Sequence, residues 1–198
     1  MQRLLFILLP LCMLACIDGS SVQGGTIFPQ DVKLSAGDVV FRRGSGFTSQ
    51  AVLLAEKGGA YSHVGIVVDS AGVPMIVHAV PDEDDEERVK MEQPCDFFAS
   101  SRAQKGAVFR HHNQTIARQA AAEAVKVYRR GVFFDHDYDT GDTTKMYCTE
   151  FVVFAYSKTA RPLPDINTHH LHLVGFESDC ILPSDLLECK DLQQVTTF

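Results

Sequence analysis

The pattern of apolar and polar positions divides the chain into short β-rich runs and helical segments. Residues 38–41 form one β-rich run, and residues 107–110 form another. Residues 62–68 and 73–80 are two further runs separated by a turn, which predicts a β-hairpin.

Three segments have the periodicity and end signals of helices. A short helix is predicted over residues 48–57, where Thr48 is a suitable N-cap. The clearest helical pattern covers residues 115–130, and a third helix is predicted over residues 147–157. After Pro162 the sequence predicts irregular structure that ends in a short Leu-bearing stretch. This order of elements predicts an α+β fold in which a small antiparallel sheet packs against helices.

The N-terminus has the features of an export signal. Arg3 precedes an apolar stretch at residues 4–14, which at about 11 residues is too short to cross a bilayer as a helix. The stretch ends near Cys16 in a sequence typical of a bacterial lipoprotein signal, although Met13 stands where Leu is usual. Cleavage by an ordinary signal peptidase near Gly19 is the alternative.

These features predict the domain organisation and the location of the protein. We expect residues 1–15 to be a signal peptide of the lipoprotein type, residues 16–35 a tether, and residues 36–198 a single globular domain. The protein would be exported and held at the membrane of the cell envelope or periplasm by lipid on Cys16. The formal net charge of −7 gives no electrostatic attraction to a phosphate backbone, so we expect no nucleic-acid partner.

The cysteines allow more than one arrangement. Export makes a disulfide chemically possible, and Cys180 and Cys189 flank a short segment that one could close. Cys95 is also available, so the pairing stays open, as does the alternative of three free thiols.

Cys148 lies where a polar loop passes into an apolar run, so it should occupy the first turn of a helix. The N-terminus of a helix stabilises a thiolate, which a nucleophilic cysteine requires. A small buried structural cysteine is the ordinary alternative, and the local sequence alone does not decide between the two.

The hairpin predicts a partner for this thiol. If residues 69–72 form the loop, Val68 pairs with Val73, and His63 lies directly opposite His78. One imidazole could then act on the thiol while the other fixes its tautomer. A slip of one residue in the register would place the two rings on opposite faces.

Three sequence blocks, at residues 37–41, 61–67 and 147–152, resemble the permuted papain-like amidases of the YiiX/YaeF type, within the NlpC-type cell-wall peptidase superfamily. In these permuted proteins the histidine strand precedes the cysteine helix, as it does here. The resemblance implies a circularly permuted papain-like fold with Cys148 as nucleophile and His63 as base.

The resemblance also suggests further site residues. It places Tyr147 beside the thiol, and Tyr61, Asp38 and Glu150 belong to the same motifs and are candidates for substrate binding. The family often has Glu at the position of His78, and a neutral histidine there would stabilise an imidazolium less. We therefore expect a less strongly formed thiolate–imidazolium pair.

An acidic loop precedes Cys148, and we expect it to form the rim of the site, where it could receive a cationic group. Its members are Asp135, Asp137, Asp139 and Asp142.

The expected activity is that of a cell-envelope thiol hydrolase. It would cleave an amide or ester through a thioester acyl-enzyme, on wall peptides or on lipid or amino-acid conjugates, with no cofactor and no metal. One alternative is a lipid acyltransferase or lipase of the lecithin–retinol acyltransferase type. Another is a non-catalytic envelope lipoprotein that acts as a binding module.

Overall fold

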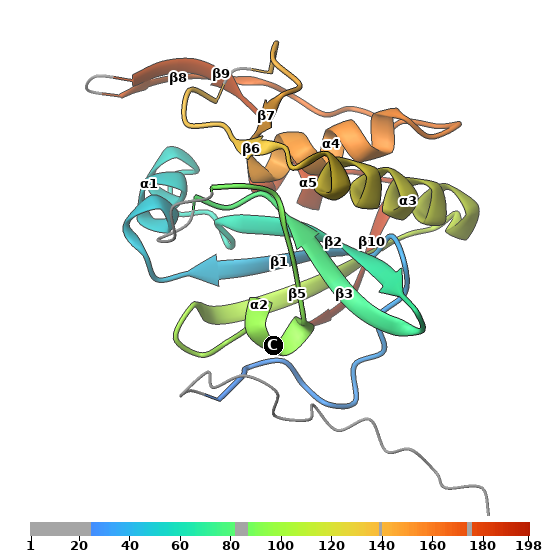
Figure 1. Cartoon of the computed structure of the whole chain (residues 1–198). Coiled ribbons are helices and arrows are strands. Elements are labelled where there is room, and N and C mark those ends of the chain that lie inside the picture. Colours follow the sequence, from blue (N-terminus) through green and yellow to red (C-terminus); the bar gives the residue numbers. More distant parts are fainter. Residues whose placement is uncertain (1–24, 82–86, 139, 174–175) are drawn as a thin grey trace, which may run out of the picture.

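A six-stranded antiparallel sheet forms the centre of the molecule, with the strand order β10-β5-β1-β2-β3-β4 (Figure 1). The structure is a computed structural model that describes residues 25–81, 87–138, 140–173 and 176–198. The predicted signal peptide, Cys16 and part of the predicted tether lie outside the described residues. The six strands are β1 (Val39–Gly44), β2 (His63–Ser70), β3 (Val73–His78), β4 (Lys90–Glu92), β5 (Ala103–His111) and β10 (Leu192–Thr197).

Helices and two small strand pairs surround this sheet. The helices are α1 (Phe47–Ala55), α2 (Pro94–Phe97), α3 (Gln114–Arg130), α4 (Cys148–Ser157) and α5 (Pro183–Leu187). The strand pairs are β6 (Phe133–Phe134) with β7 (Lys145–Met146), and β8 (His169–Leu173) with β9 (Phe176–Cys180). The α+β class and the three predicted helices are confirmed.

Different helices and segments cover the two faces of the sheet. Helices α3 and α4 lie together over one face, where the larger apolar core forms (Figure 1). The other face is covered by α2, by the segment before β1 and by the C-terminus. There the rings of Phe28, Phe98 and Phe198 pack together at centroid distances of 5.0–5.7 Å.

Local sequence explains why α3 begins and ends where it does. The side chain of Asn113 accepts hydrogen bonds from the backbone N–H groups of Thr115 and Ile116, which caps the first turn. Gly131 ends the helix in the left-handed conformation, with a φ of 65°. Apolar residues recur along one side of the helix, so α3 packs against the sheet and against α4.

The β2–β3 hairpin forms as predicted, but its predicted register is wrong by two residues. The turn is the two-residue Ala71–Gly72 pair, both with positive φ, rather than a four-residue loop. Ser70 therefore pairs with Val73, and continuing this register places Gly65 opposite His78. Because side chains alternate with a period of two, this shift keeps His63 and His78 on the same face.

The C-terminal region is more regular than the sequence predicted. The residues after Pro162 form the β8–β9 pair, helix α5 and strand β10, which pairs with β5 at the sheet edge. The prediction of irregular structure here is wrong, since β10 gains its hydrogen bonds from a strand some 80 residues earlier in the chain.

Cys148, Cys180 and Cys189 carry free thiols. Cys95 and Cys148 are partly exposed, whereas Cys180 and Cys189 are buried and unpaired. In the structure Cys180 and Cys189 are thus separate thiols rather than a disulfide. Within the described ranges, no helix has the length and apolar character needed to cross a membrane.

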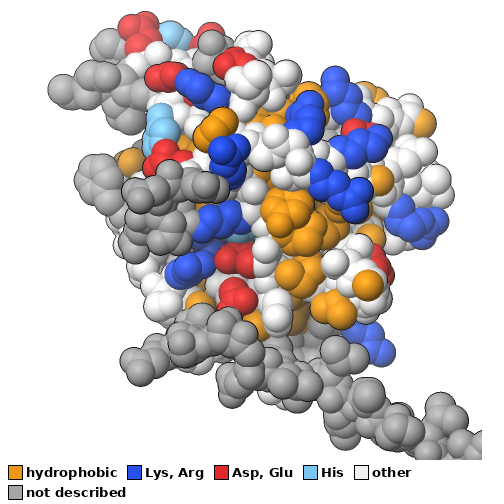
Figure 2. Space-filling model, viewed as in Figure 1, with side chains coloured by type: hydrophobic (Ala, Val, Ile, Leu, Met, Phe, Trp, Pro, Cys, Tyr) orange, Lys and Arg blue, Asp and Glu red, His pale blue; other side chains and the backbone are white. Residues whose placement is uncertain are grey.

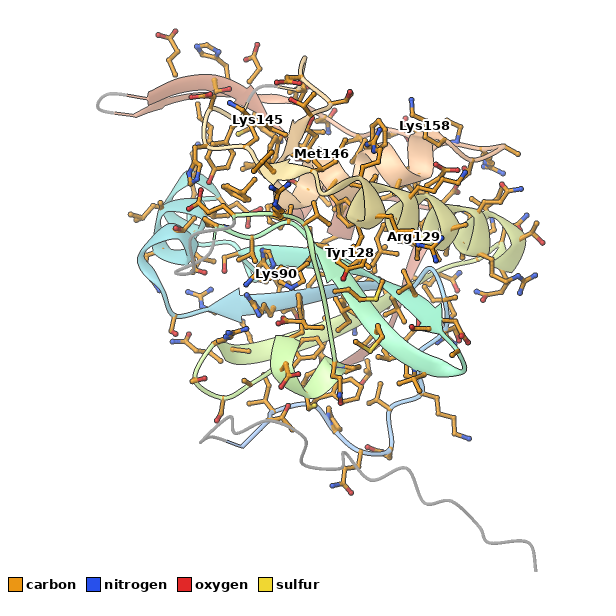
Figure 3. All side chains as sticks on the ribbon, in the orientation of Figure 1. Lys90, Tyr128, Arg129, Lys145, Met146 and Lys158 are labelled. Atoms are coloured by element: carbon orange, nitrogen blue, oxygen red, sulfur yellow. The ribbon has the colours of Figure 1, made fainter. Side chains whose placement is uncertain are left out.

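One buried hydrogen bond ties α4 to the segment just before β1, and its loss should destabilise the fold. Tyr156 in α4 is fully buried, and its hydroxyl donates to the carbonyl of Gly37 at 2.7 Å. Tyr156→Phe should lower the free energy of unfolding in urea by about 1–2 kcal/mol, because the carbonyl loses its partner. Tyr128→Phe is the control, since Tyr128 lies 39% exposed on α3 (Figure 3). Equal stability of the two variants would contradict this assignment.

Candidate active site

Cys148 is the first residue of α4 and is partly exposed. The start of this helix is held by the preceding residue, Tyr147. Its backbone N–H donates to Glu150 Oε2 at 3.3 Å, and its hydroxyl accepts from the N–H of Ile181 at 2.9 Å. The thiol is therefore presented from a fixed helix N-terminus, as the sequence predicted.

A pair of buried histidines contributes the basic groups of the site. His63 begins β2 and His78 ends β3, and His63 Nε2 lies 2.8 Å from His78 Nδ1. Gly65 stands opposite His78 in the continued register. A Cβ on Gly65 would lie 3.1 Å from the Cβ of His78 and 2.8 Å from a methyl group of Ile76. The missing side chain therefore leaves room for the two rings to meet diagonally across the strands.

The carboxylate of Glu92 contacts the histidine pair at the nitrogen of His78 that does not face His63. Glu92, at the end of β4, has Oε1 at 3.0 Å from His78 Nε2. Arg102 donates to Glu92 Oε2 at 3.2 Å, and Arg42 Nη1 lies 4.0 Å from Oε1. Glu92 is therefore held between a histidine and two guanidinium groups.

Phe97 of α2 closes the far side of this cluster. Its ring stacks on His63 at 5.6 Å between centroids and meets His78 edge-on at 5.1 Å. Arg42 lies over the same ring and donates to the Phe97 carbonyl at 2.6 Å. Because the imidazoles are packed between the sheet and this ring, their orientations are fixed.

The contacts assign the proton positions of the neutral histidines. An ionised carboxylate only accepts hydrogen bonds, so Glu92 at 3.0 Å favours the His78 tautomer that carries its proton on Nε2. His78 Nδ1 then carries a lone pair and accepts from His63 Nε2–H. The remaining nitrogen of His63, Nδ1, is left with a free lone pair and is the basic atom of the site.

The electrostatic environment favours neutral groups at this site. Burial lowers the pKa of His63 well below its usual range, and Arg42 and His78 lower it further. Burial also lowers the pKa of His78, although Glu92 opposes that shift. Burial alone would raise the pKa of Glu92, but its contacts with His78 and the two arginines bring it below the usual value. Glu92 is therefore ionised while both histidines are neutral at pH 7.

Burial is also the largest influence on the pKa of the Cys148 thiol. It raises the pKa of Cys148 to about 11, although the backbone N–H groups of Val64, Thr149 and Cys148 itself act in the opposite direction. The expectation that the helix N-terminus produces a thiolate in the resting protein is thus outweighed by desolvation. The resting site therefore holds a thiol and a neutral imidazole.

Cys148, His63 and His78 line the same cavity, whose volume is about 670 Å³. Its wall is apolar in part and cationic in part. The other lining residues are Arg42, Ser45, Gly46, Thr48, Ser49, Val52, Ser62, Val80, Pro81, Lys90, Ser101, Arg102, Phe134 and Tyr138.

The structure places the four predicted substrate-binding residues outside the described wall of this cavity. Tyr147 and Glu150 are buried at the start of α4, where they support the helix as described above. Tyr61 packs against Phe41 at 5.7 Å between ring centroids, and the Asp38 carboxylate accepts from Arg110 at 2.7 Å. In the structure these four side chains thus hold the fold around the site.

The acidic loop also lies differently from the prediction. Of its described members, none lines the cavity, whereas the neighbouring Phe134 and Tyr138 do. Asp139 lies outside the described residues. Among the described residues, the wall of the site thus presents aromatic side chains and cations, and no carboxylate.

Sequence reasoning missed Glu92, Arg42 and Arg102. The only signal for Glu92 was a short alternation of apolar and polar residues at 89–92, too brief to predict a strand. Arg42 follows a predicted strand and pairs with His63 across β1 and β2, a relation that only the register reveals.

A cysteine at a helix start that shares a cavity with a histidine strand defines the papain-like class. The chain belongs to the permuted papain-like amidase enzymes of the YaeF/YiiX type, the C92 family, whose model matches residues 33–196. The family is one of cysteine peptidase-like hydrolases, and the circularly permuted papain-like fold is confirmed.

One solved structure with this fold is described as metalloprotein yiiX from Escherichia coli O157:H7. It aligns with a TM-score of 0.67 and 18% sequence identity, over 82% of this chain and 97% of that one. At this identity the likeness shows the fold alone. No curated protein sequence matches the chain.

One described cluster has the composition of a metal site. His111 Nε2 and His112 Nδ1 lie 3.7 and 3.6 Å from the two oxygens of Asp191. However, the backbone N–H of Asn113 donates to His111 Nδ1 at 2.9 Å, which places the imidazole proton on Nε2, the atom that would bind the ion. Arg161 Nε also lies 3.3 Å from Asp191. With a proton on His111 Nε2 and a guanidinium group next to Asp191, these residues do not suit a bound cation.

Proposed function

We propose that the protein is a cysteine hydrolase that cleaves an amide or ester bond, with Cys148 as nucleophile and His63 as general base. The observation that carries this proposal is the contact of His63 Nε2 with His78 Nδ1, backed by Glu92. This contact occupies one nitrogen of His63 and leaves Nδ1 as the basic atom in the cavity that Cys148 also lines.

The proposed reaction begins with a thiol rather than a thiolate. His63 Nδ1 takes the proton of Cys148 as the sulfur attacks the carbonyl carbon. The resulting oxyanion is stabilised by backbone N–H groups at the start of α4, in particular that of Cys148. When the carbon–nitrogen or carbon–oxygen bond breaks, His63 returns the proton to the leaving group, and the acyl group remains on sulfur as a thioester.

Water completes the proposed cycle. His63 activates a water molecule that attacks the thioester, and the acid leaves as the thiol reforms. His78 and Glu92 keep the His63 ring in one tautomer throughout and stabilise its transient positive charge, as the third residue of a triad does. Glu92 thereby supplies the carboxylate that the family often carries at the position of His78.

Acylation by an activated ester tests this proposal. With p-nitrophenyl acetate, we expect one acetyl group on Cys148, detected by peptide mass, followed by its release to water. Cys148→Ala should abolish this acylation, and His63→Ala should slow it by about 10²–10⁴-fold, because the base is lost. Cys95→Ser is the control, since Cys95 is partly exposed but lies outside the described cavity wall.

The fate of the acetyl group separates the alternatives. Release to water supports a hydrolase. Release only on addition of an amine or alcohol would point to an acyltransferase of the lecithin–retinol acyltransferase type. Equal ester cleavage by the wild type and Cys148→Ala would contradict the proposal and leave the binding-module alternative.

We also propose that the protein acts at the cell envelope, on wall peptides or on lipid or amino-acid conjugates. Support comes from the charged, apolar and small residues before Cys16. Mass spectrometry of the protein purified from membranes should find Cys16 as an acylated N-terminus. Cys16→Ser should move the protein to the soluble fraction, whereas an unmodified Cys16 in a membrane-free wild-type protein would contradict a lipid anchor.

A further inference from the structure

In the described wall of the active-site cavity, positively charged side chains outnumber negatively charged ones. Three cationic side chains line it, those of Arg42, Lys90 and Arg102, and no described carboxylate does. We propose that this cationic wall binds a carboxylate group of the substrate, next to the bond that Cys148 attacks. This inference rests on the proposed function, and it specifies the substrate as an acyl conjugate that carries a negative charge.

The arrangement around Glu92 explains why the wall remains cationic. Glu92 is the carboxylate that Arg42 and Arg102 contact, and it also influences Lys90. Because both histidines are neutral, two guanidinium groups face this one carboxylate among the described residues. Burial lowers the pKa of Lys90, Glu92 opposes that shift, and the positive charge of Arg102 adds to it.

Arg102 is the residue best placed to meet a ligand. Its side chain is 52% exposed, whereas that of Arg42 is 9% exposed and engaged with the carbonyl and ring of Phe97. Arg102 contacts Glu92 through one nitrogen, Nη1. Its planar guanidinium matches the two oxygens of a carboxylate. Lys90 of β4 pairs with His78 of β3 across the two strands. It lies over the sheet, left of centre in Figure 3.

The start of α1 adds to the same potential. Gly46, Thr48 and Ser49 line the cavity, and Gly46, the N-cap residue, provides no side-chain cap. The positive end of the helix dipole therefore faces the cavity alongside the cations. Hydroxyl groups of Ser45 and Ser101 supply neutral polar contacts at the same wall.

The rest of the wall suits an apolar portion of the substrate. Val52, Val80, Pro81, Phe134 and Tyr138 line it. A ligand with an apolar part and a carboxylate would satisfy both kinds of surface. Peptides and amino-acid conjugates carry such a carboxylate, so they fit this wall better than neutral amides or esters do.

A preference of Cys148 for an anionic reagent would have to arise from the residues around the cavity. The chain carries a net charge of −7, which by itself repels a negative reagent. Figure 2 shows Lys and Arg side chains gathered over the middle and right of one face, with Asp and Glu side chains prominent at the top, around the β8–β9 pair. A measured preference for an anion at Cys148 would thus report the cavity rather than the whole protein.

Alkylation with two reagents of nearly equal size tests the proposal. Iodoacetate is negatively charged and iodoacetamide is neutral, and both react with the same thiolate. The ratio of their rates at Cys148 is therefore independent of the thiol pKa. At pH 8.5 and low salt, we expect this ratio to exceed that of 2-mercaptoethanol by about threefold or more, and 0.5 M NaCl should reduce the excess.

Variants locate the source of the preference. Arg102→Gln and Lys90→Gln should each bring the ratio toward that of 2-mercaptoethanol. Lys105→Gln makes the same change in net charge, but Lys105 lies outside the described cavity wall and should leave the ratio unchanged. The two cavity variants are independent, so failure of one to fold still leaves a test.

The outcomes separate this inference from the proposed function. If Cys148 reacts with iodoacetamide but shows no preference for iodoacetate, the anion site is refuted and the hydrolase proposal stands. A preference that Lys105→Gln reduces as much as Arg102→Gln also refutes it. If Cys148 reacts with neither reagent, the proposed function fails, and the inference fails with it.

Discussion

The active site depends on one buried interaction, the contact of His78 with His63 on one side and Glu92 on the other. The two distances, 2.8 and 3.0 Å, join three side chains from three adjacent strands. An imidazole between a carboxylate and a second imidazole can hold its proton on only one nitrogen, so the tautomer of each ring follows from the charge on Glu92. The basicity that the proposed mechanism requires of His63 is thus set by Glu92, which acts on His63 through His78.

Burying this carboxylate would be unfavourable without compensation, and the surrounding structure supplies it. Arg42 and Arg102 balance the charge of Glu92, and Phe97 excludes water from the rings. The same burial keeps Cys148 protonated, so the site stores neither a thiolate nor an imidazolium in the resting state. The proposed anion-binding wall follows from the same residues, because the cations that secure Glu92 exceed it in charge.

Local patterns predicted much of this fold, whereas pairing between distant segments could not be predicted. The helices around Gln114–Arg130 and Cys148–Ser157 follow from periodicity and capping, which are local. The hairpin register failed because Ala71 adopts a positive φ, which alanine rarely does, so the two-residue turn left no clear signal. Glu92 and β10 were missed since each belongs to a strand whose partner is fixed only by tertiary packing.

The most direct test of the account is the protonation state of the imidazole nitrogens, measured by ¹⁵N NMR of the histidine side chains. His63→Gln and His78→Gln variants would assign the signals. Between about pH 6.5 and 8, we expect both rings to be neutral, with the proton on Nε2 in each and a lone pair on Nδ1 of His63. A proton on Nδ1 of His63, or a His63 ring that is protonated at pH 7, would contradict the account.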